Sequence, residues 1–310
     1  MGRIRGIGRV LRSVPTIEGA GVRLNRAFGY RHVPALDPFL LLDDFTSGNP
    51  VDYLKGFPWH PHRGIETITY VLHGKVAHGD SMGNAGVIGE GDIQWMTAGS
   101  GIIHQEMPGG DTSGRLQGFQ LWANLPASRK MMDPRYRGIG AADIPVLDLE
   151  GGAQVRVIAG AVEGTAGPVR EIVTGPTYLD VTLPGRGVFS RAEAEGRTVF
   201  AYVISGTGFF DERRDPYSFP VEGGPYFDLG GEAAVGPGNV ILYGGGGDEV
   251  RITAGEDGMR FLFISGKPIG EPVTWYGPIV MNTQEELRVA FQEYRDGTFI
   301  KYRGARTGGT

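Results

Sequence analysis

Two short runs of the sequence, WHPH and IHQE, carry the side chains best suited to chemistry. Each run places two metal-competent side chains at positions i and i+2. Side chains of an extended strand alternate between its faces, so His60 and His62 project together, and so do His104 and Glu106. If the two runs lie across from one another in a small barrel, three imidazoles and one carboxylate converge. This set of donors suits a borderline metal such as iron, nickel, copper, manganese or zinc.

The identity of the carboxylate is open on this argument. Glu66 has the same parity as His60 and His62, and it follows them closely enough to face the same way. Glu106 has the same parity as His104. Parity does not choose between the two acids, and whichever is not a ligand can still support the site as a neighbour. Zinc on three imidazoles and one carboxylate would be a closed tetrahedral site, whereas iron(II) or nickel would keep open positions.

Short strands and tight turns must position these side chains. The chain of 310 residues has 53 glycines and 20 prolines, which suits many short strands joined by turns. Residues 65–72 are rich in β-branched and aromatic types and predict a strand. Segments 36–45, 87–96 and 117–125 predict further strands, whereas residues 126–145 read as a polar connector. Together these patterns predict an all-β protein.

The second half of the chain repeats the pattern of strands and turns of the first half, but it lacks the candidate ligands. Residues 70–74 match 202–206, and residues 91–93 match 238–240. Under these alignments the positions of the four candidate ligands carry Ala192, Ala194, Arg251 and Thr253. All six histidines also lie in the first third of the chain. We therefore expect one metal ion, held by the first half only.

Composition excludes several classes of protein. There is no cysteine, which excludes disulfides, thiolate metal sites and iron–sulfur clusters. The net charge of -5 and the lack of a Lys/Arg cluster argue against direct binding of nucleic acid. No apolar run is long enough to span a bilayer, and the first twelve residues do not resemble a secretory signal. We expect a cytoplasmic protein with no membrane contact, and a monomer.

The residues around the two runs resemble the cupin motifs of the pirin family. Residues 56–67 are similar to the first motif in its pirin form, and residues 91–107 to the second. Segments 37–41, 120–125 and 277–283 also resemble pirins. The resemblance spans most of the chain and is most specific in the first half.

The resemblance implies an architecture of two tandem cupin (jelly-roll) β-barrels with a short C-terminal helix. The expected boundaries are 1–135 for the N-terminal barrel with the metal site, 136–282 for the C-terminal barrel without ligands, and 283–310 for the helix and tail. A Thr-x-x-Glu capping box beginning at Thr283 independently predicts the start of that helix. The metal ligands of the family carry over to His60, His62, His104 and Glu106, with iron(II) as the expected ion.

The resemblance also implies two activities known in the family. Some bacterial pirins open the flavonol quercetin with dioxygen, and the mammalian member is an iron-dependent transcriptional cofactor. We therefore expect a metal-dependent dioxygenase, a quercetinase-like oxidoreductase, acting on a flavonol or related enol, with Glu106 as ligand and general base. The alternative is a non-enzymatic, redox-sensing regulator that binds a protein partner. A third reading makes the metal merely structural.

Several further side chains near the motifs have two readings each. An apolar pocket could be lined by four of them, which could equally be ordinary barrel core: Phe57, Trp59, Met96 and Met107. Arg63 is expected at the surface or in an ion pair rather than as a substrate clamp. His78, before Gly79, could approach the opening of the metal site, but it is expected to be a turn residue. His73 is expected to be exposed, and His32 to be structural.

Overall fold

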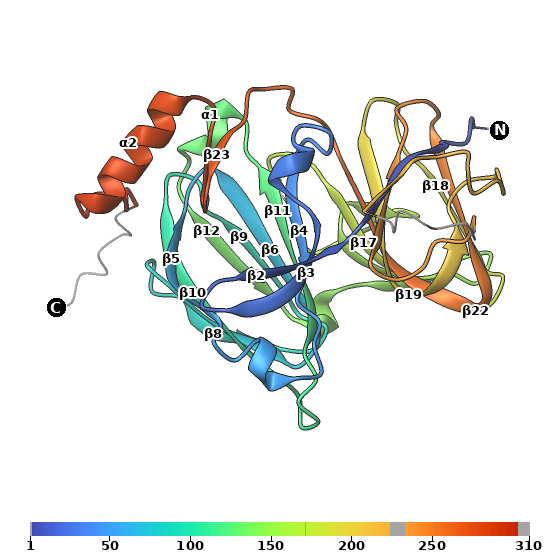
Figure 1. Cartoon of the computed structure of the whole chain (residues 1–310), viewed down its shortest axis with the longest axis horizontal. Helices are drawn as coiled ribbons and strands as arrows, with labels where there is room; N and C mark the ends of the chain where they lie inside the picture. Colours follow the sequence, from blue (N-terminus) through green and yellow to red (C-terminus); the bar gives the residue numbers. More distant parts are fainter. Residues whose placement is uncertain (1, 171, 224–232, 303–310) are drawn as a thin grey trace. The chain divides into compact units, whose positions relative to one another are not determined.

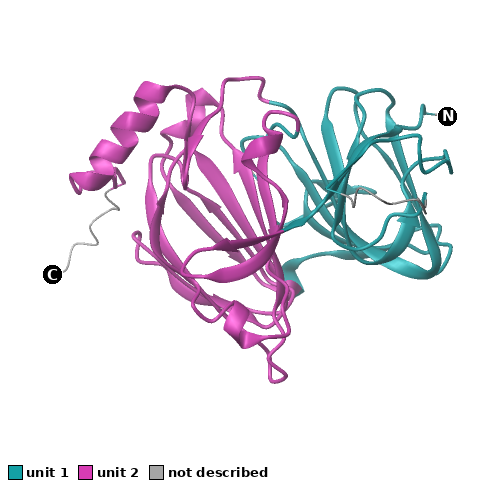
Figure 2. Ribbon diagram, in the orientation of Figure 1, with its two compact units in different colours: residues 1–14, 36–38, 142–268 teal, residues 15–35, 39–141, 269–310 magenta. Residues whose placement is uncertain are grey.

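The computed structural model describes residues 2–170, 172–223 and 233–302, and they form two compact units (Figures 1 and 2). Unit 1 comprises residues 1–14, 36–38 and 142–268. Unit 2 comprises residues 15–35, 39–141 and 269–310. The units interleave along the chain and do not follow the three consecutive segments expected from the sequence. The physical reason is strand pairing, because the first strand joins the sheet of unit 1 and the C-terminal segment packs within unit 2.

Unit 2 is built from two antiparallel sheets that face each other (Figure 1). The larger has seven strands in the order β12-β9-β6-β11-β4-β3-β2, and the smaller has four in the order β5-β10-β7-β8. The larger sheet contains β2 (Val14–Glu18), β3 (Val22–Phe28), β4 (Phe39–Asp44), β6 (Ile65–His73), β9 (Ile93–Thr97), β11 (Gln117–Asn124) and β12 (Arg135–Ile139). The smaller contains β5 (Phe57–His62), β7 (Lys75–Asp80), β8 (Ala85–Ile88) and β10 (Ile102–Gly109).

The strands of unit 2 follow the sequence patterns closely where β-branched residues are dense. Strand β6 confirms the strand expected over 65–72, and β11 confirms the one expected over 117–125. The segment 126–145 is more than a connector. It holds the short helix α1 (Ala127–Lys130), the edge strand β12 and the 3-10 turn η3 (Ala141–Asp143). Strand β12 has the sequence RYRGI, in which two arginines occupy alternate positions and a glycine follows, so it lacks an apolar period.

Unit 1 has one nine-stranded sheet in which β22 is the central strand. Its path runs β13-β14-β17-β22-β19-β21-β1-β20, and β18 also pairs with β22. The strands are β1 (Ile7–Arg12), β13 (Val146–Asp148), β14 (Gln154–Ala159), β17 (Thr177–Leu183), β18 (Val188–Ala192), β19 (Thr198–Phe209), β20 (Val221–Glu222), β21 (Asn239–Tyr243) and β22 (Glu249–Gly266). The pair β15 (Ala161–Val162) and β16 (Thr165–Ala166) completes the described strands of this unit.

The interior of unit 1 is filled with apolar side chains, and this corrects the alignment of the two halves. On β22, Val250 and Ile252 belong to the core, and Ile252 pairs across to Phe189, which is also buried. Arg251, which the sequence aligned with His104, is exposed and faces outward. A shift of one residue exchanges the two faces of a strand. The inward positions of unit 1 are therefore apolar. The sequence alignment, which placed Arg251 and Thr253 at the positions of His104 and Glu106, had selected outward positions instead.

The C-terminal segment belongs to unit 2. It contains the hairpin β23 (Thr274–Tyr276) and β24 (Ile279–Met281), followed by helix α2 (Gln284–Arg295). The helix confirms the expected capping box, because the Thr283 hydroxyl accepts from the Glu286 N–H and the Glu286 side chain accepts from the Thr283 N–H. Short 3-10 turns lie at η1 (Tyr30–His32) and η2 (Pro50–Asp52). Among the described residues, no helix is long and apolar enough to cross a membrane.

Candidate metal centre

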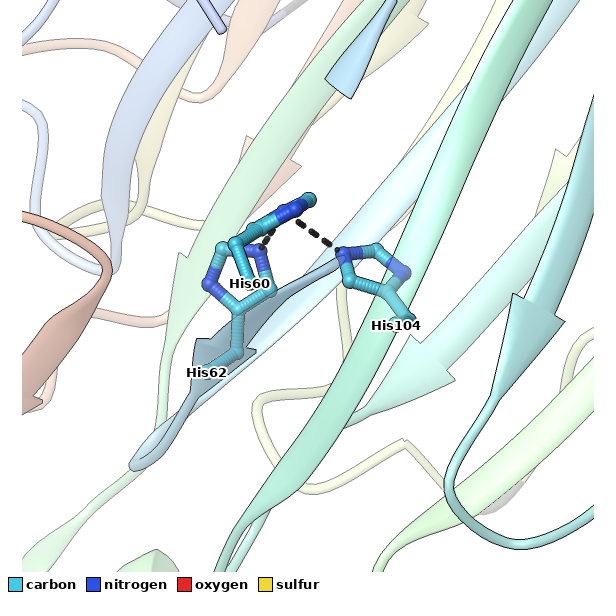
Figure 3. A group of neighbouring side chains, drawn as sticks. All are labelled: His60, His62 and His104. Atoms are coloured by element: carbon cyan, nitrogen blue, oxygen red, sulfur yellow. Dashed lines mark hydrogen bonds between the residues drawn. The ribbon is translucent and has the colours of Figure 1, made fainter. Parts of the chain in front are cut away.

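Three imidazoles from two adjacent strands meet inside unit 2 (Figure 3). Strands β5 and β10 run antiparallel, and His60 lies directly opposite His104. The Nε2 atom of His60 is 3.1 Å from Nε2 of His62 and 2.9 Å from Nε2 of His104. The sequence argument from alternating faces thus places all three rings together, as expected.

The hydrogen bonds behind two of the rings fix the direction of their lone pairs. Nδ1 of His60 donates to the carbonyl of Pro58 at 2.8 Å, and Nδ1 of His62 donates to the carbonyl of Pro278 at 3.0 Å. In a neutral imidazole whose Nδ1 carries the proton, Nε2 is an acceptor only. Two acceptor lone pairs therefore face each other at 3.1 Å. A cation between them would convert this repulsion into ligation, so the residues fit a bound metal ion.

Burial favours the protonation state that metals require. It lowers the pKa of His62 well below its ordinary value, and the neighbouring His60 adds to the effect. Burial likewise lowers the pKa of His104, with further contributions from His62 and His60. Both rings are neutral at physiological pH, and a neutral imidazole is the form that binds metal.

The spacing of the nitrogens favours right-angled ligands. At a metal–nitrogen distance of about 2.1 Å, nitrogens at a right angle lie about 3.0 Å apart, and nitrogens at the tetrahedral angle about 3.4 Å apart. The observed separations of 2.9 and 3.1 Å match the first case. Right-angled pairs of ligands suit an octahedral ion, which would have positions left for other ligands.

Glu106 lies on the same strand as His104 and is 7% exposed. Its Oε1 accepts from the Thr69 hydroxyl at 2.9 Å and from the Gln94 amide at 3.4 Å. Thr69 Oγ1 also lies 2.7 Å from the Gln120 amide oxygen, yet a hydroxyl has one proton. With the Gln120 amide turned over, its nitrogen donates to Thr69, and Thr69 donates to Glu106. Thr69 and Gln94 thus hold one carboxylate oxygen and leave the other unengaged by them.

Glu66 points away from the three imidazoles. It lies on β6, where Thr69 faces the barrel interior and reaches Glu106. Residues 66 and 69 differ by an odd number, so their side chains project from opposite faces. Glu66 is buried on its own face and accepts a hydrogen bond from Thr97 at 2.8 Å. The parity with His62 fails because Gly64, at a φ of 78°, turns the chain between the two strands.

A cavity of about 860 Å³ opens beside the imidazoles within unit 2. A row of aromatic rings forms one wall of the cavity. The distance between ring centroids is 5.0 Å from His62 to Trp122, 5.7 Å from Trp122 to Trp275, and 5.6 Å from Trp275 to Tyr30. Glu106 lines the cavity together with His60. Other lining residues are Leu24, Leu41, Phe45, Phe57, Pro58, Val76, Pro108, Tyr276, Gly277 and Pro278.

Of the four side chains considered for the pocket, Phe57 lines the cavity, Met96 is buried, and Met107 is half-buried and not among the lining residues. Trp59 is 53% exposed, and it neighbours Gly79 and Gln105 rather than the cavity. It directly precedes His60 on β5, so its ring projects from the face of the strand opposite to the His60 ring.

The expectations for the remaining histidines need one correction. His78 is not in a turn but buried on β7, where its Nε2 lies 3.3 Å from Asp80 and its ring stacks on Tyr136. A strand containing a glycine and a terminal aspartate looked like a turn in the sequence. His73 lies at the end of β6, partly exposed, and with Glu90 and Asp111 it brings three further donor atoms within 4.8 Å.

Arg63 is an ion-pair residue, but it is buried rather than at the surface. Its Nη1 lies 2.8 Å from Glu293 Oε2, its Nη2 donates to the Phe299 carbonyl, and its guanidinium lies 4.2 Å from the centroid of the Phe299 ring. Through Arg63, the C-terminal segment therefore contacts the end of the strand that carries His60 and His62. Nothing in the sequence near Arg63 indicated partners so far along the chain.

Two further residues of the site were missed by the sequence. Lys130 is 1% exposed and donates to the Gly64 and Val280 carbonyls and to Asn124 Oδ1. Pro278 supplies the carbonyl that orients His62 from 216 positions away. A lysine in a polar connector and a backbone carbonyl carry no sequence signal for such roles.

Comparisons with known proteins agree with this geometry. The Pirin family matches residues 21–123, and the Pirin C-terminal cupin domain matches residues 178–300. The chain is 43% identical to the "Pirin-like protein" of Caulobacter vibrioides, over 96% of this chain and 99% of that protein. It is 41% identical to the "Putative quercetin 2,3-dioxygenase" of Pseudomonas aeruginosa, again over 96% of this chain and 99% of that protein. The crystal structure of quercetin 2,3-dioxygenase from Acinetobacter baumannii superposes with a TM-score of 0.80 at 30% identity, covering 96% of this chain and 98% of that one.

Proposed function

The chain belongs to the pirin family of tandem cupin proteins, and from this premise we propose that unit 2 is a metal-dependent dioxygenase acting on a flavonol or related enol. The observation that carries the proposal is the convergence of three imidazole nitrogens beside a largely apolar cavity of about 860 Å³, which His60 and His62 line. Relatives named as quercetin 2,3-dioxygenases support the substrate class.

The ligands in this proposal are His60, His62, His104 and Glu106. Three imidazoles and one carboxylate would leave open positions on an octahedral ion, which suits iron(II) as the resident ion; nickel, manganese, copper or zinc could also use this set. The ion, when bound, supplies Lewis acidity and a common anchoring point for an enol oxygen and dioxygen.

Glu106 is the base in this proposal. One of its oxygens is held by Thr69 and Gln94, so the carboxylate cannot rotate freely. The other oxygen can receive the enol hydroxyl proton, provided the substrate lies within hydrogen-bond reach.

The cavity wall orients the substrate in this proposal. Trp122 and Trp275 present faces and edges against which a flat aromatic substrate can pack, and such aromatic pairs contribute about 0.5–1.5 kcal/mol beyond burial. Phe45, Phe57 and Val76 add further apolar lining. A substrate that fills this volume excludes water from the side of Glu106 that faces it.

The test is incubation of protein loaded with iron(II), nickel or manganese with quercetin in air. We expect the flavonol absorbance to fall while carbon monoxide is released. In Glu106→Gln we expect the absorbance to persist and no carbon monoxide to form. A Glu66→Gln protein is the matched control because this acid faces away from the cavity. Absence of turnover with all three metals would remove quercetin as substrate and favour a regulator that uses the same ligands to bind a protein partner.

A further inference from the structure

A row of polar side chains crosses five strands of the larger sheet of unit 2 and ends away from the imidazoles. The strand register pairs Arg26 with Asp43, Asp43 with Gln120, Gln120 with Thr69, and Thr69 with Gln94. Directly paired residues share one face of a sheet. The Thr69 end reaches Glu106, so this face is the one inside the barrel.

The far end of the row is a charged group on the cavity wall. Arg26 donates to both oxygens of Asp43 at 2.8 Å and to Oε1 of Glu18 at 2.8 Å. All three side chains line the cavity. Two carboxylates on one guanidinium leave a net charge of -1. Both oxygens of Asp43 and one oxygen of Glu18 accept hydrogen bonds from Arg26. Among the described residues no donor binds the other Glu18 oxygen, which is therefore available to a ligand.

We propose that Glu18, Asp43 and Arg26 form a subsite that recognises hydroxyl groups on the end of the substrate remote from the metal. This inference rests on the proposed function, and it narrows the substrate to a neutral, hydroxylated aromatic. A carboxylate accepts hydrogen bonds from phenols and repels an anion, and bonds to a charged acceptor are the stronger kind. An aromatic acid is therefore rejected at this end.

The distance between the two ends sets the size of the substrate. Thr69 and Asp43 are two strands apart, on β6 and β4 with β11 between them. Neighbouring strands are about 4.8 Å apart, so the two side chains are on the order of 10 Å apart. A single benzene ring is too short to contact both Glu106 and the subsite. A molecule of two or three fused or linked rings can do so.

The experiment compares three ligands that differ only at the remote ring: 3-hydroxyflavone, its 3′,4′-dihydroxy derivative and its 4′-carboxy derivative. Binding to the iron(II)-loaded protein is measured under nitrogen by quenching of tryptophan fluorescence, since Trp122 and Trp275 line the cavity. We expect the dihydroxy compound to bind about tenfold more tightly than 3-hydroxyflavone, and the carboxylate less tightly than either.

Glu18→Gln tests the subsite itself, because it removes the charge while keeping the shape. We expect the advantage of the dihydroxy compound to fall below about threefold with the affinity for 3-hydroxyflavone unchanged. Glu222→Gln is the matched control: Glu222 also pairs with an arginine, Arg9, at 2.9 Å, but in unit 1. It should retain the full advantage.

Four results would overturn the inference: equal binding of the hydroxylated and bare flavonols, tighter binding of the carboxylate, an unchanged advantage in Glu18→Gln, or no binding of any of the three. Failure of the proposed function is seen separately. When air is admitted to the complexes, discrimination between ligands without oxygen uptake would refute the dioxygenase and leave the subsite intact.

Discussion

Replacing Lys130 by methionine tests whether the C-terminal hairpin is fastened to the end of β5, the strand that carries two of the proposed ligands. The Lys130 ammonium donates to the Gly64 carbonyl at 2.9 Å, to Asn124 Oδ1 at 2.6 Å and to the Val280 carbonyl at 3.1 Å. Gly64 follows His62 by two residues, and Val280 follows Pro278, whose carbonyl holds the His62 ring. One buried cation therefore joins the two segments that orient a proposed ligand.

The magnitude follows from the three acceptors. Methionine has a similar length and no donor, so two backbone carbonyls and one amide oxygen lose a partner in a buried place. Each unsatisfied acceptor costs about 1–3 kcal/mol. The Gly64 carbonyl keeps the Leu125 N–H at 3.3 Å, and relief of the buried charge offsets a further part of the sum. We expect the free energy of unfolding to fall by about 3 kcal/mol at pH 7. Metal affinity should fall about tenfold, as for other groups that orient ligands.

The loss should grow with pH. Burial lowers the pKa of Lys130 to about 7, whereas a lysine in an unfolded chain titrates near 10.4. Between these values the unfolded state binds more protons than the folded state, so this group makes the free energy of unfolding rise with pH. The contribution is greatest above the unfolded pKa and is lost as pH falls through 7. The deficit of the variant should therefore increase by about 1.4 kcal/mol per unit from pH 7 upward.

Urea unfolding of the two proteins at pH 6, 7, 8 and 9 measures this dependence. Lys75→Met is the control, because Lys75 is an exposed lysine on β7 and its removal should change stability by less than about 0.5 kcal/mol at every pH. A deficit below 1 kcal/mol would refute the assigned hydrogen-bonding role of Lys130, and a deficit that is the same from pH 6 to 9 would refute its lowered pKa.

Three further predictions concern the site directly. Glu106→Gln should weaken iron(II) binding at least tenfold in a competition titration, whereas Glu66→Gln should leave it within about twofold; the reverse order would make the second acid the ligand. Gly64→Ala should cost at least about 2 kcal/mol in urea unfolding, since φ is 78° and the new Cβ would overlap the Val280 carbonyl; wild-type stability would contradict that packing. Trp275→Leu should raise KM for quercetin at least threefold with a smaller change in kcat, and an unchanged KM would remove this ring from the substrate wall.

The sequence predicted what depends on local pattern. Alternating faces on two strands brought His60, His62 and His104 together, because parity within one strand is a reliable geometric rule. The same rule failed for Glu66, since a glycine at positive φ separates it from His62 and restarts the count. Position parity therefore predicts the face of a side chain only within one unbroken strand.

Long-range partners were beyond reach for a different reason. The carbonyl of Pro278 and the ammonium of Lys130 act through backbone proximity between segments far apart in sequence. Every residue has a backbone carbonyl, so neither composition nor periodicity indicates which carbonyl orients a ligand. The family resemblance supplied the tandem architecture, whereas the interleaving of the two units came only from strand pairing.

The two units put different side chains at the inward positions of the same kind of sheet. In unit 1 the inward side chains, such as Phe189 and Ile252, close on one another and leave an apolar core. In unit 2 they include the imidazoles and the polar row, which cannot be buried without partners. The partners are Arg26 for Asp43, and Thr69 and Gln94 for Glu106. Because these polar groups satisfy one another along the walls, the interior of unit 2 can remain an open cavity rather than collapse into a core.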